Sequence, residues 1–365
     1  MLIIFAVFIS LVVSLVFCEI VVRIVAPQNL TGLCFEQTNK GLYVNRSKGS
    51  VKAQYGSRIV RYNYFYPHLR DTPLREGGIK ILTVGDSFTF GVLLDKADVI
   101  TSYLQRYADK EFGKDKFIFL NAATGGWGTA DYVAFIEDFG EEIKPNIILV
   151  MINIDDIGRS VISKLFSFAP ETNLGLKRNI LIMDKFKESI HSIPEYEWLL
   201  EHSHLAQLVR RAFVLFFQKN SFLGKSPEDI ISGPNSSVSD YAIKLGHTLF
   251  IYLDKWCSNR DVDLYISTTG WHSAKKSDNN WFELTRIFMS TAQEFFKSIN
   301  VPFFDISPYM PEDKTKYTFP ERHPNEEGAK LIADNVWRNF LKERLTNYLR
   351  KNANRDANRQ TSPLS

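Results

Sequence analysis

Cysteine is scarce in this chain of 365 residues, which contains only Cys18, Cys34 and Cys257. None of the three is spaced like the ligands of a metal site, and three cysteines cannot form a disulfide framework. A single bridge between Cys34 and Cys257 would require an oxidising compartment, and the alternative is two free buried thiols. The sequence therefore predicts no metal site, and we expect no cofactor.

A strong charge imbalance, nucleotide-binding motifs and internal repeats are also lacking. The net charge of +3 is too small to indicate a nucleic-acid partner. The chain has neither a P-loop nor a Gly-x-Gly-x-x-Gly fingerprint, which disfavours a nucleotide-binding domain. What is present is typical of a folded globular protein: 45% of the residues are hydrophobic and 23% are charged. A chain of this length can hold one large domain or two small ones.

The first 25 residues form a long hydrophobic segment. From Met1 to Cys18 it is apolar apart from two serines, and the apolar character continues past Glu19 to Val25. Such a length is typical of a membrane-spanning helix. A cleaved signal peptide is the alternative, but a basic n-region and a small-residue cleavage site are missing. We therefore expect residues 1–25 to be an uncleaved single-pass anchor whose partner is the membrane.

The orientation of this anchor is open from the sequence. Several basic residues follow the span, among them Arg23, Lys40 and Arg46. The positive-inside rule alone would keep them in the cytoplasm, but large folded domains are translocated despite their charge. We expect the domain after the anchor to lie outside the cytoplasm.

Beyond the anchor, the pattern predicts an α/β domain. Residues 26–78 are predicted to be a stalk and an accessory segment that packs at the edge of that domain. From residue 79 onward, short apolar runs alternate with amphipathic stretches, which favours a mostly parallel sheet with helices on both faces. Strands are predicted at 79–84, 117–120, 147–152, 262–267 and 302–304, and helices at 99–112, 130–143, 239–257 and 280–299.

Two segments depart from this alternation. Residues 160–234, approximately, are predicted to be an insertion over the carboxyl edge of the sheet, either a lid or a packing elaboration. The domain is predicted to cover residues 79–348, with its last helix ending near Tyr348. Residues 349–365 are polar and predicted to be a disordered tail.

Chemistry-bearing residues follow the ends of the predicted strands. Ser87 ends the run Ile79–Ser87, at the edge where open α/β sheets bind their ligands. A serine nucleophile needs an adjacent base, and His323, just before the last helix, is the natural one. The backbone N–H groups of Ser87 and Gly126 and the side-chain amide of Asn153 would supply donors for an oxyanion. The alternative for Ser87 is that it merely caps a helix.

Three motifs in this order carry a family resemblance: GDSFTFG at Ser87, NAATGGWGT at Gly126 and ERHPNEEG at His323. They resemble the SGNH (GDSL) hydrolase superfamily over residues 79–345. The resemblance implies a three-layer α/β/α sandwich with a flavodoxin-like sheet, and ester hydrolysis or acyl transfer. It also implies Ser87 as the nucleophile, Gly126 as a backbone donor and His323 as the base.

Two departures from the family pattern concern the oxyanion site and the catalytic acid. The family's third block is Gly-x-Asn-Asp, and the ungapped match places Asp155 at the position of the oxyanion asparagine. A carboxylate there repels an oxyanion unless it is protonated, whereas Asn153 points to the same side of an extended chain and is the alternative. The family's aspartate before the histidine is replaced by Glu321 and Pro320, so either Glu321 or a backbone carbonyl would orient His323.

Two functions follow as hypotheses from these residues. The first is a serine esterase or O-acyltransferase acting on an acyl ester, for instance an acetyl ester of a cell-envelope glycan or lipid. The second is a non-catalytic SGNH-like binding or assembly module, which the departures at Asp155 and Pro320 favour.

Overall fold

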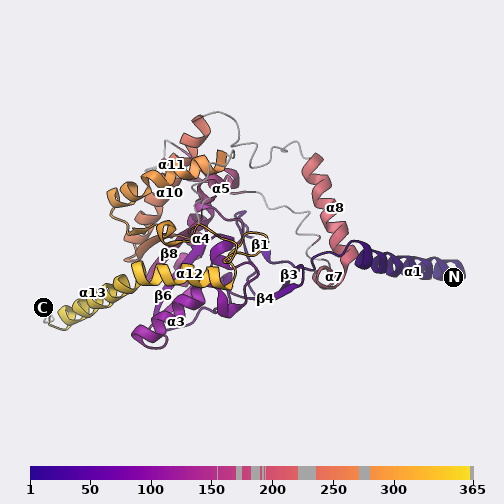
Figure 1. Cartoon of the computed structure of the whole chain (residues 1–365), viewed down its shortest axis with the longest axis horizontal. Coiled ribbons are helices and arrows are strands. Elements are labelled where there is room, and N and C mark those ends of the chain that lie inside the picture. The colour runs from indigo at the N-terminus through magenta and orange to yellow at the C-terminus, as the bar shows by residue number, and fades with distance from the viewer. Residues whose placement is uncertain are drawn as a thin grey trace.

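The computed structural model describes residues 1–153, 155–169, 175–181, 190, 193, 195–220, 236–270 and 280–361. Within these ranges, the side chains of residues 216–220, 236–239, 280–286 and 355–361 are not described. An α/β body forms most of the molecule, and the apolar helix α1 (Leu2–Val25) projects from it at the N-terminal end (Figure 1). None of the residues of α1 is buried, and its length and composition suffice to cross a membrane.

The body is built on an eight-stranded sheet with the order β12-β11-β8-β6-β7-β5-β4-β3. Its parallel part consists of β12 (Phe303–Phe304), β11 (Asp263–Thr268), β8 (Ile147–Ile152), β6 (Ile79–Gly85) and β7 (Phe117–Asn121). In chain order this part reads 2-1-3-4-5, the flavodoxin-like arrangement. The predicted α/β fold class with a mostly parallel sheet is therefore confirmed, and each predicted strand end agrees within one residue.

The accessory segment supplies the antiparallel edge of the sheet. This edge consists of β5 (Leu69–Arg70), β4 (Arg58–Phe65) and β3 (Gly49–Tyr55), of which β5 pairs with β7. A separate hairpin, β1 (Phe35–Gln37) and β2 (Tyr43–Asn45), precedes them. The accessory segment thus packs at the edge of the main domain by extending its sheet.

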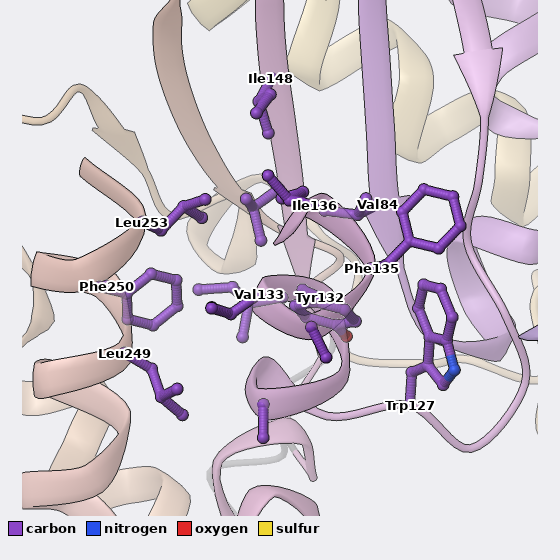
Figure 2. Close-up of a cluster of buried hydrophobic side chains, with 14 of the residues drawn as sticks. Val84, Trp127, Tyr132, Val133, Phe135, Ile136, Ile148, Leu249, Phe250 and Leu253 are labelled. Carbon is purple, nitrogen blue, oxygen red and sulfur yellow. The ribbon is translucent and has the colours of Figure 1, made fainter. Parts of the chain in front are cut away.

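Helices cover both faces of the sheet. One face carries α3 (Ile100–Phe112), α12 (Glu326–Val336), a π-helical turn (Trp337–Leu341) and α13 (Lys342–Thr361). The other face carries α4 (Thr129–Ile143), α5 (Asp156–Ser163), α10 (Ser236–Ser258) and α11 (Asn280–Ser298). Figure 2 shows this second layer, where Phe250 of α10 and Val133 of α4 pack toward Ile148 of β8. The apolar faces of the amphipathic helices thus enclose the sheet in two buried layers.

The segment predicted as an insertion contributes no strand to the central sheet in its described part. It begins within α5 and continues through the hairpin β9 (Phe166–Phe168) and β10 (Leu176–Arg178). The helices α7 (Tyr196–His202) and α8 (His204–Asn220) follow. Between the main elements lie the one-turn helix α2 (Ser87–Phe90) and the 3-10 turns Lys96–Asp98 and Ser307–Tyr309.

Of the two alternatives for the cysteines, the structure has free thiols at Cys34 and Cys257, and burial raises the pKa of the Cys34 thiol to about 11. One expectation from the sequence differs from the structure. The last helix continues to Thr361, into the segment from residue 349 that we expected to be disordered. Tyr348 and Leu349 pack against the apolar cluster under α12, which carries the helix past the predicted end.

Candidate active site

Ser87 lies at the junction between β6 and α2. The strand ends at Gly85, Asp86 is the N-cap of α2, and Ser87 is the first residue of the helix. A Cβ atom at residue 85 would lie 2.3 Å from Oγ1 of Thr89, so only glycine fits this close turn. Because β6 pairs with β7 on one side and β8 on the other, Ser87 stands at the switch point of the parallel order. The capping role belongs to Asp86, so capping does not explain Ser87.

The carboxylate of Asp86 makes most of the polar contacts next to Ser87. Asp86 is completely buried, and its Oδ1 accepts the backbone N–H of Phe88 at 2.9 Å. Its Oδ2 lies 2.8 Å from Nδ2 of Asn153 and 3.2 Å from Nη1 of Arg159. The hydroxyl of Ser87 lies 3.4 Å from the same oxygen. Asp86 therefore joins the nucleophile candidate to the loop after β8.

Arg159 brings one positive charge to three carboxylates. In addition to Asp86, its guanidinium lies 3.2 Å from Oδ2 of Asp155 and 3.5 Å from Oδ1 of Asp156. Asp156 is fully buried, and its Oδ2 accepts hydrogen bonds from the Tyr132 hydroxyl and the Asn153 backbone N–H. Burial raises the pKa of Asp156 well above its usual value, and the nearby charge of Asp86 adds to that rise. The guanidinium compensates part of this buried negative charge.

The two oxyanion candidates from the third motif take different positions. The side chain of Asn153 is buried and reaches Asp86, next to Ser87. The side chain of Asp155 is 39% exposed and pairs with Arg159. Burial also raises the pKa of Asp155, and the charge of Arg159 opposes that rise. Of the two, Asn153 is thus the residue that contacts the immediate neighbour of Ser87.

Gly126 lies on a turn that faces Ser87 through its neighbour Gly125. The backbone N–H of Trp127 donates to the carbonyl of Thr124, which closes a four-residue turn, and Gly126 has a φ of +82° at its third position. A Cβ atom at Gly125 would lie 4.0 Å from Cβ of Ser87, whereas one at Gly126 would have no neighbour within 4 Å. Gly126 is exposed, so its backbone can be approached from solvent.

His323 reaches the site from the loop before α12. A backbone hydrogen bond of 2.8 Å from Phe319 to the carbonyl of His323 closes this loop. The His323 ring lies against the ring of Phe88, with 5.6 Å between the centroids, and Phe88 follows Ser87 directly. Burial lowers the pKa of His323, whereas the charges of Asp86 and Glu321 oppose that lowering. The imidazole is therefore held neutral, as a general base requires.

In the described part of the chain, no hydrogen bond joins the serine, the histidine and the glutamate. Among the described residues, Ser87 and His323 form no hydrogen bond with each other, and Nδ1 of His323 has no partner. Both carboxylate oxygens of Glu321 are buried and likewise have no hydrogen-bond partner in that part of the chain. Catalytic hydrogen bonds are often long in unliganded enzymes and tighten in the substrate complex.

Sequence reasoning missed Arg159, Asp156 and the contacts of Asp86. Asp86 stands in the Gly-Asp-Ser motif, but nothing in that motif names its partners. The spacing of Asp156 and Arg159, three residues apart on a helix, indicates a pair on one face. Their proximity to Asp86, which is 70 residues before Asp156 and 73 before Arg159, follows only from the adjacency of β6 and β8.

Comparison with solved structures finds esterases among the similar folds. The psychrotrophic esterase EstA from Pseudoalteromonas sp. is 13% identical with a TM-score of 0.42, and the match covers 73% of this chain and 98% of EstA. A variant of the acetylxylan esterase Axe2 from Geobacillus stearothermophilus is 13% identical with a TM-score of 0.41, over 73% of this chain and 95% of Axe2. TesA is 12% identical with a TM-score of 0.40, over 71% of this chain and 96% of TesA.

These similarities are distant. No family model matches the sequence, and no curated protein matches it either. At TM-scores below 0.5 the similarities fix neither a substrate nor a catalytic residue, so the assignment of the fold and the site depends on the strand order and contacts described above. What they establish is that this chain is similar in structure to esterases of low sequence identity.

Proposed function

We propose that the chain is a membrane-anchored serine esterase or O-acyltransferase of the SGNH superfamily, with Ser87 as the nucleophile. The observation that carries the proposal is the convergence at the end of β6. There the Ser87 hydroxyl, the Asn153 amide and the His323 ring approach from three loops that are far apart in the sequence. A serine on a sharp strand-to-helix turn at a sheet's carboxyl edge is a suitable geometry for a nucleophile.

The mechanism begins with attack of Ser87 Oγ on the carbonyl carbon of the acyl ester. His323 accepts the hydroxyl proton as the new C–O bond forms, and the carbonyl oxygen becomes an oxyanion. The backbone N–H groups of Ser87 and Gly126 and the amide of Asn153 stabilise that charge. Collapse breaks the bond to the alcohol, which leaves with the proton from His323 and generates an acyl-Ser87 intermediate.

The second half of the reaction separates hydrolysis from transfer. Water attacks the acyl-Ser87 carbonyl in hydrolysis, whereas the hydroxyl of a second substrate attacks it in transfer. In both cases His323 takes the proton from the attacking oxygen and returns it to Ser87 Oγ, which restores the enzyme. Glu321 orients His323 in this proposal, since its carboxylate lies close enough to raise the pKa of the imidazole.

The same proposal places the domain outside the cytoplasm, where acyl esters of cell-envelope glycans or lipids would be its substrates. Contacts of α1 with the body support an anchor that stays attached. Glu19 of α1 accepts a hydrogen bond of 2.8 Å from Ser203, and Arg23 donates to the carbonyl of His202 at 3.2 Å. If α1 were a signal sequence removed by cleavage, the mature protein would lack these contacts. Protease accessibility in intact cells tests the orientation.

A fluorophosphonate probe tests the catalytic proposal directly, because it reacts with an activated serine. We expect the full chain in detergent to be labelled at Ser87, and Ser87→Ala to abolish both labelling and turnover of a short acyl ester. Ser102→Ala, on α3, is the matched control and should retain both. Labelling of Ser87→Ala at the level of the parent chain would contradict the proposal.

A non-catalytic binding module is the second candidate. The missing hydrogen bond between Ser87 and His323, and the unpartnered Nδ1 of His323 among the described residues, favour it. This candidate predicts that the parent chain is not labelled by the probe, although it is folded.

A further inference from the structure

The anchor helix α1 is tied to the beginning of α8. The carboxylate of Glu19 on α1 accepts hydrogen bonds from the backbone N–H groups of His204 and Leu205, at 3.1 and 2.8 Å. These N–H groups belong to the first turn of α8, where backbone N–H groups have no carbonyl partner within the helix. A carboxylate at this position also interacts favourably with the helix dipole. The start of α8 is therefore fixed beside the end of the apolar part of α1.

The inner face of α8 is held by the body. The side-chain amide of Gln207 donates to the carbonyl of Thr31 at 2.7 Å and to that of Leu200 at 2.6 Å. Gln207 is buried, and the backbone N–H of Gln28 donates to the His204 ring at 2.8 Å. The first half of α8 is thus rigidly placed between α1 and the accessory segment.

The middle of α8, from Val209 to Leu215, is largely exposed, and it is apolar apart from Arg210 and Arg211. Val209 and Phe213, four residues apart on one face of the helix, are 58% and 42% exposed. Gln207, which the body holds, lies on the other side of the helix. Exposed apolar side chains that share a helix face mark a surface that contacts another apolar phase.

The position of α8 identifies that phase. Residues 2–18 of α1 are uncharged, so Glu19 marks the level at which a spanning α1 meets the headgroups. Figure 1 shows α8 starting near the base of α1 and running crosswise to it. A helix that starts at this level and runs across the anchor extends along the membrane surface.

We propose that α8 is an interfacial helix that lies in the surface of the bilayer anchoring α1. Val209 and Phe213 enter the boundary between headgroups and acyl chains, and Arg210, beside that face, reaches the lipid phosphates. α1 and α8 together then hold the domain in one orientation at the membrane. This inference depends on α1 being a retained anchor, and it is independent of the esterase activity.

A fluorescent probe at position 209 tests the proposal. Val209→Cys in a Cys18→Ser background is labelled with an environment-sensitive dye, and the full chain is reconstituted in vesicles of phosphatidylcholine and phosphatidylglycerol. Lys330→Cys, exposed on α12, is the matched control, and the Cys18→Ser parent measures labelling of the other two cysteines. A chain labelled at native Cys18 reports separately whether α1 is inserted.

We expect the emission of the 209 probe to shift to the blue and to be quenched by lipids brominated near the headgroups, several-fold more strongly than at position 330. Emission equal to that of the control, with the Cys18 probe quenched, would overturn the proposal and leave the anchor in place. A blue shift without bromine quenching would also overturn it, since a second protein copy would then cover the helix. Absence of quenching at Cys18 would remove its premise, the anchor.

Discussion

The side-chain amide of Asn153 donates to the carboxylate of Asp86 at 2.8 Å, and Asp86 immediately precedes Ser87. The contact joins the ends of β8 and β6, the two strands at the switch point of the sheet. It places an amide donor beside the serine, whereas Asp155 pairs with Arg159. In the proposed esterase, Asn153 rather than Asp155 is therefore the donor to the oxyanion.

Replacing Asn153 should impair catalysis far more than replacing Asp155. We expect Asn153→Ala to lower kcat by about 10²- to 10³-fold, the usual loss for one oxyanion donor. Asp155→Asn is the matched control. The side chain of Asp155 is partly exposed and pairs with Arg159, so its replacement should change kcat by less than about threefold. Steady-state kinetics with a short acyl ester measure both. A rise of kcat in Asp155→Asn, together with an unchanged kcat in Asn153→Ala, would assign the oxyanion site to residue 155.

Arg159 should be needed for stability because it neutralises buried carboxylates. In Arg159→Met, the fully buried Asp86 and Asp156 lose their counter-charge, and we expect a loss of about 3–5 kcal/mol in the free energy of unfolding. Arg75→Met is the control, since it breaks an exposed pair with Asp115 and should cost less than about 1 kcal/mol. Urea unfolding of both variants provides the measurement.

The pH dependence of that loss has a definite sign. Burial raises the pKa of Asp156 in the folded state and Arg159 opposes that rise, so without the guanidinium this pKa lies further above its unfolded value. A carboxyl group with a raised folded pKa destabilises the fold when pH rises through that pKa, and the penalty disappears at lower pH. The deficit of Arg159→Met should therefore be smaller at pH 5 than at pH 8, and an equal deficit at both would refute this charge argument.

The sequence predicted the parts of the fold that depend on local patterns. Ile147–Ile152 is a continuous apolar run followed by polar residues, and it is a fully buried strand. The loops that hold Ser87 and Asn153 were predicted to meet because parallel strands end at one edge of the sheet, and the loop of His323 was predicted to precede the last helix. The link between Asp86 and Arg159 was not predictable, since it depends on how two distant loops meet. The exposed apolar side chains of α8 also escaped prediction, because burial of an amphipathic segment depends on what lies beside it.

We expect the acid limb of the pH profile of kcat/KM to have its midpoint below pH 6.5. His323 must be neutral to accept the serine proton, and burial lowers its pKa from 6.5. The charge of Glu321 opposes that lowering, so Glu321→Gln should lower the pKa further and shift the acid limb of kcat/KM to lower pH. Glu327→Gln, an exposed partner of Lys316, is the control and should leave the limb in place. A shift of the limb to higher pH in Glu321→Gln would contradict this assignment.

Arg70 should position the turn after Ser87. It is completely buried, its Nη1 donates to the carbonyls of Phe90 and, at 2.6 Å, Gly91, and its Nη2 donates to the carbonyl of Leu94. The guanidinium also lies 4.4 Å from the ring centroid of Phe90. These carbonyls belong to the segment that ends α2, so Arg70 fixes the helix on which Ser87 stands.

We expect Arg70→Met to cost about 3–5 kcal/mol in the free energy of unfolding, because it leaves the carboxylate of Asp71 and the carbonyls after α2 without their donor. If Arg70 positions Ser87, the folded variant should also react more slowly with a fluorophosphonate probe at temperatures well below its Tm. The double variant Arg70→Met with Asp71→Asn separates the two effects, since it removes the unpaired carboxylate. It should recover part of the stability but not the rate of probe labelling. Full recovery of labelling would mean that Arg70 acts only by neutralising Asp71.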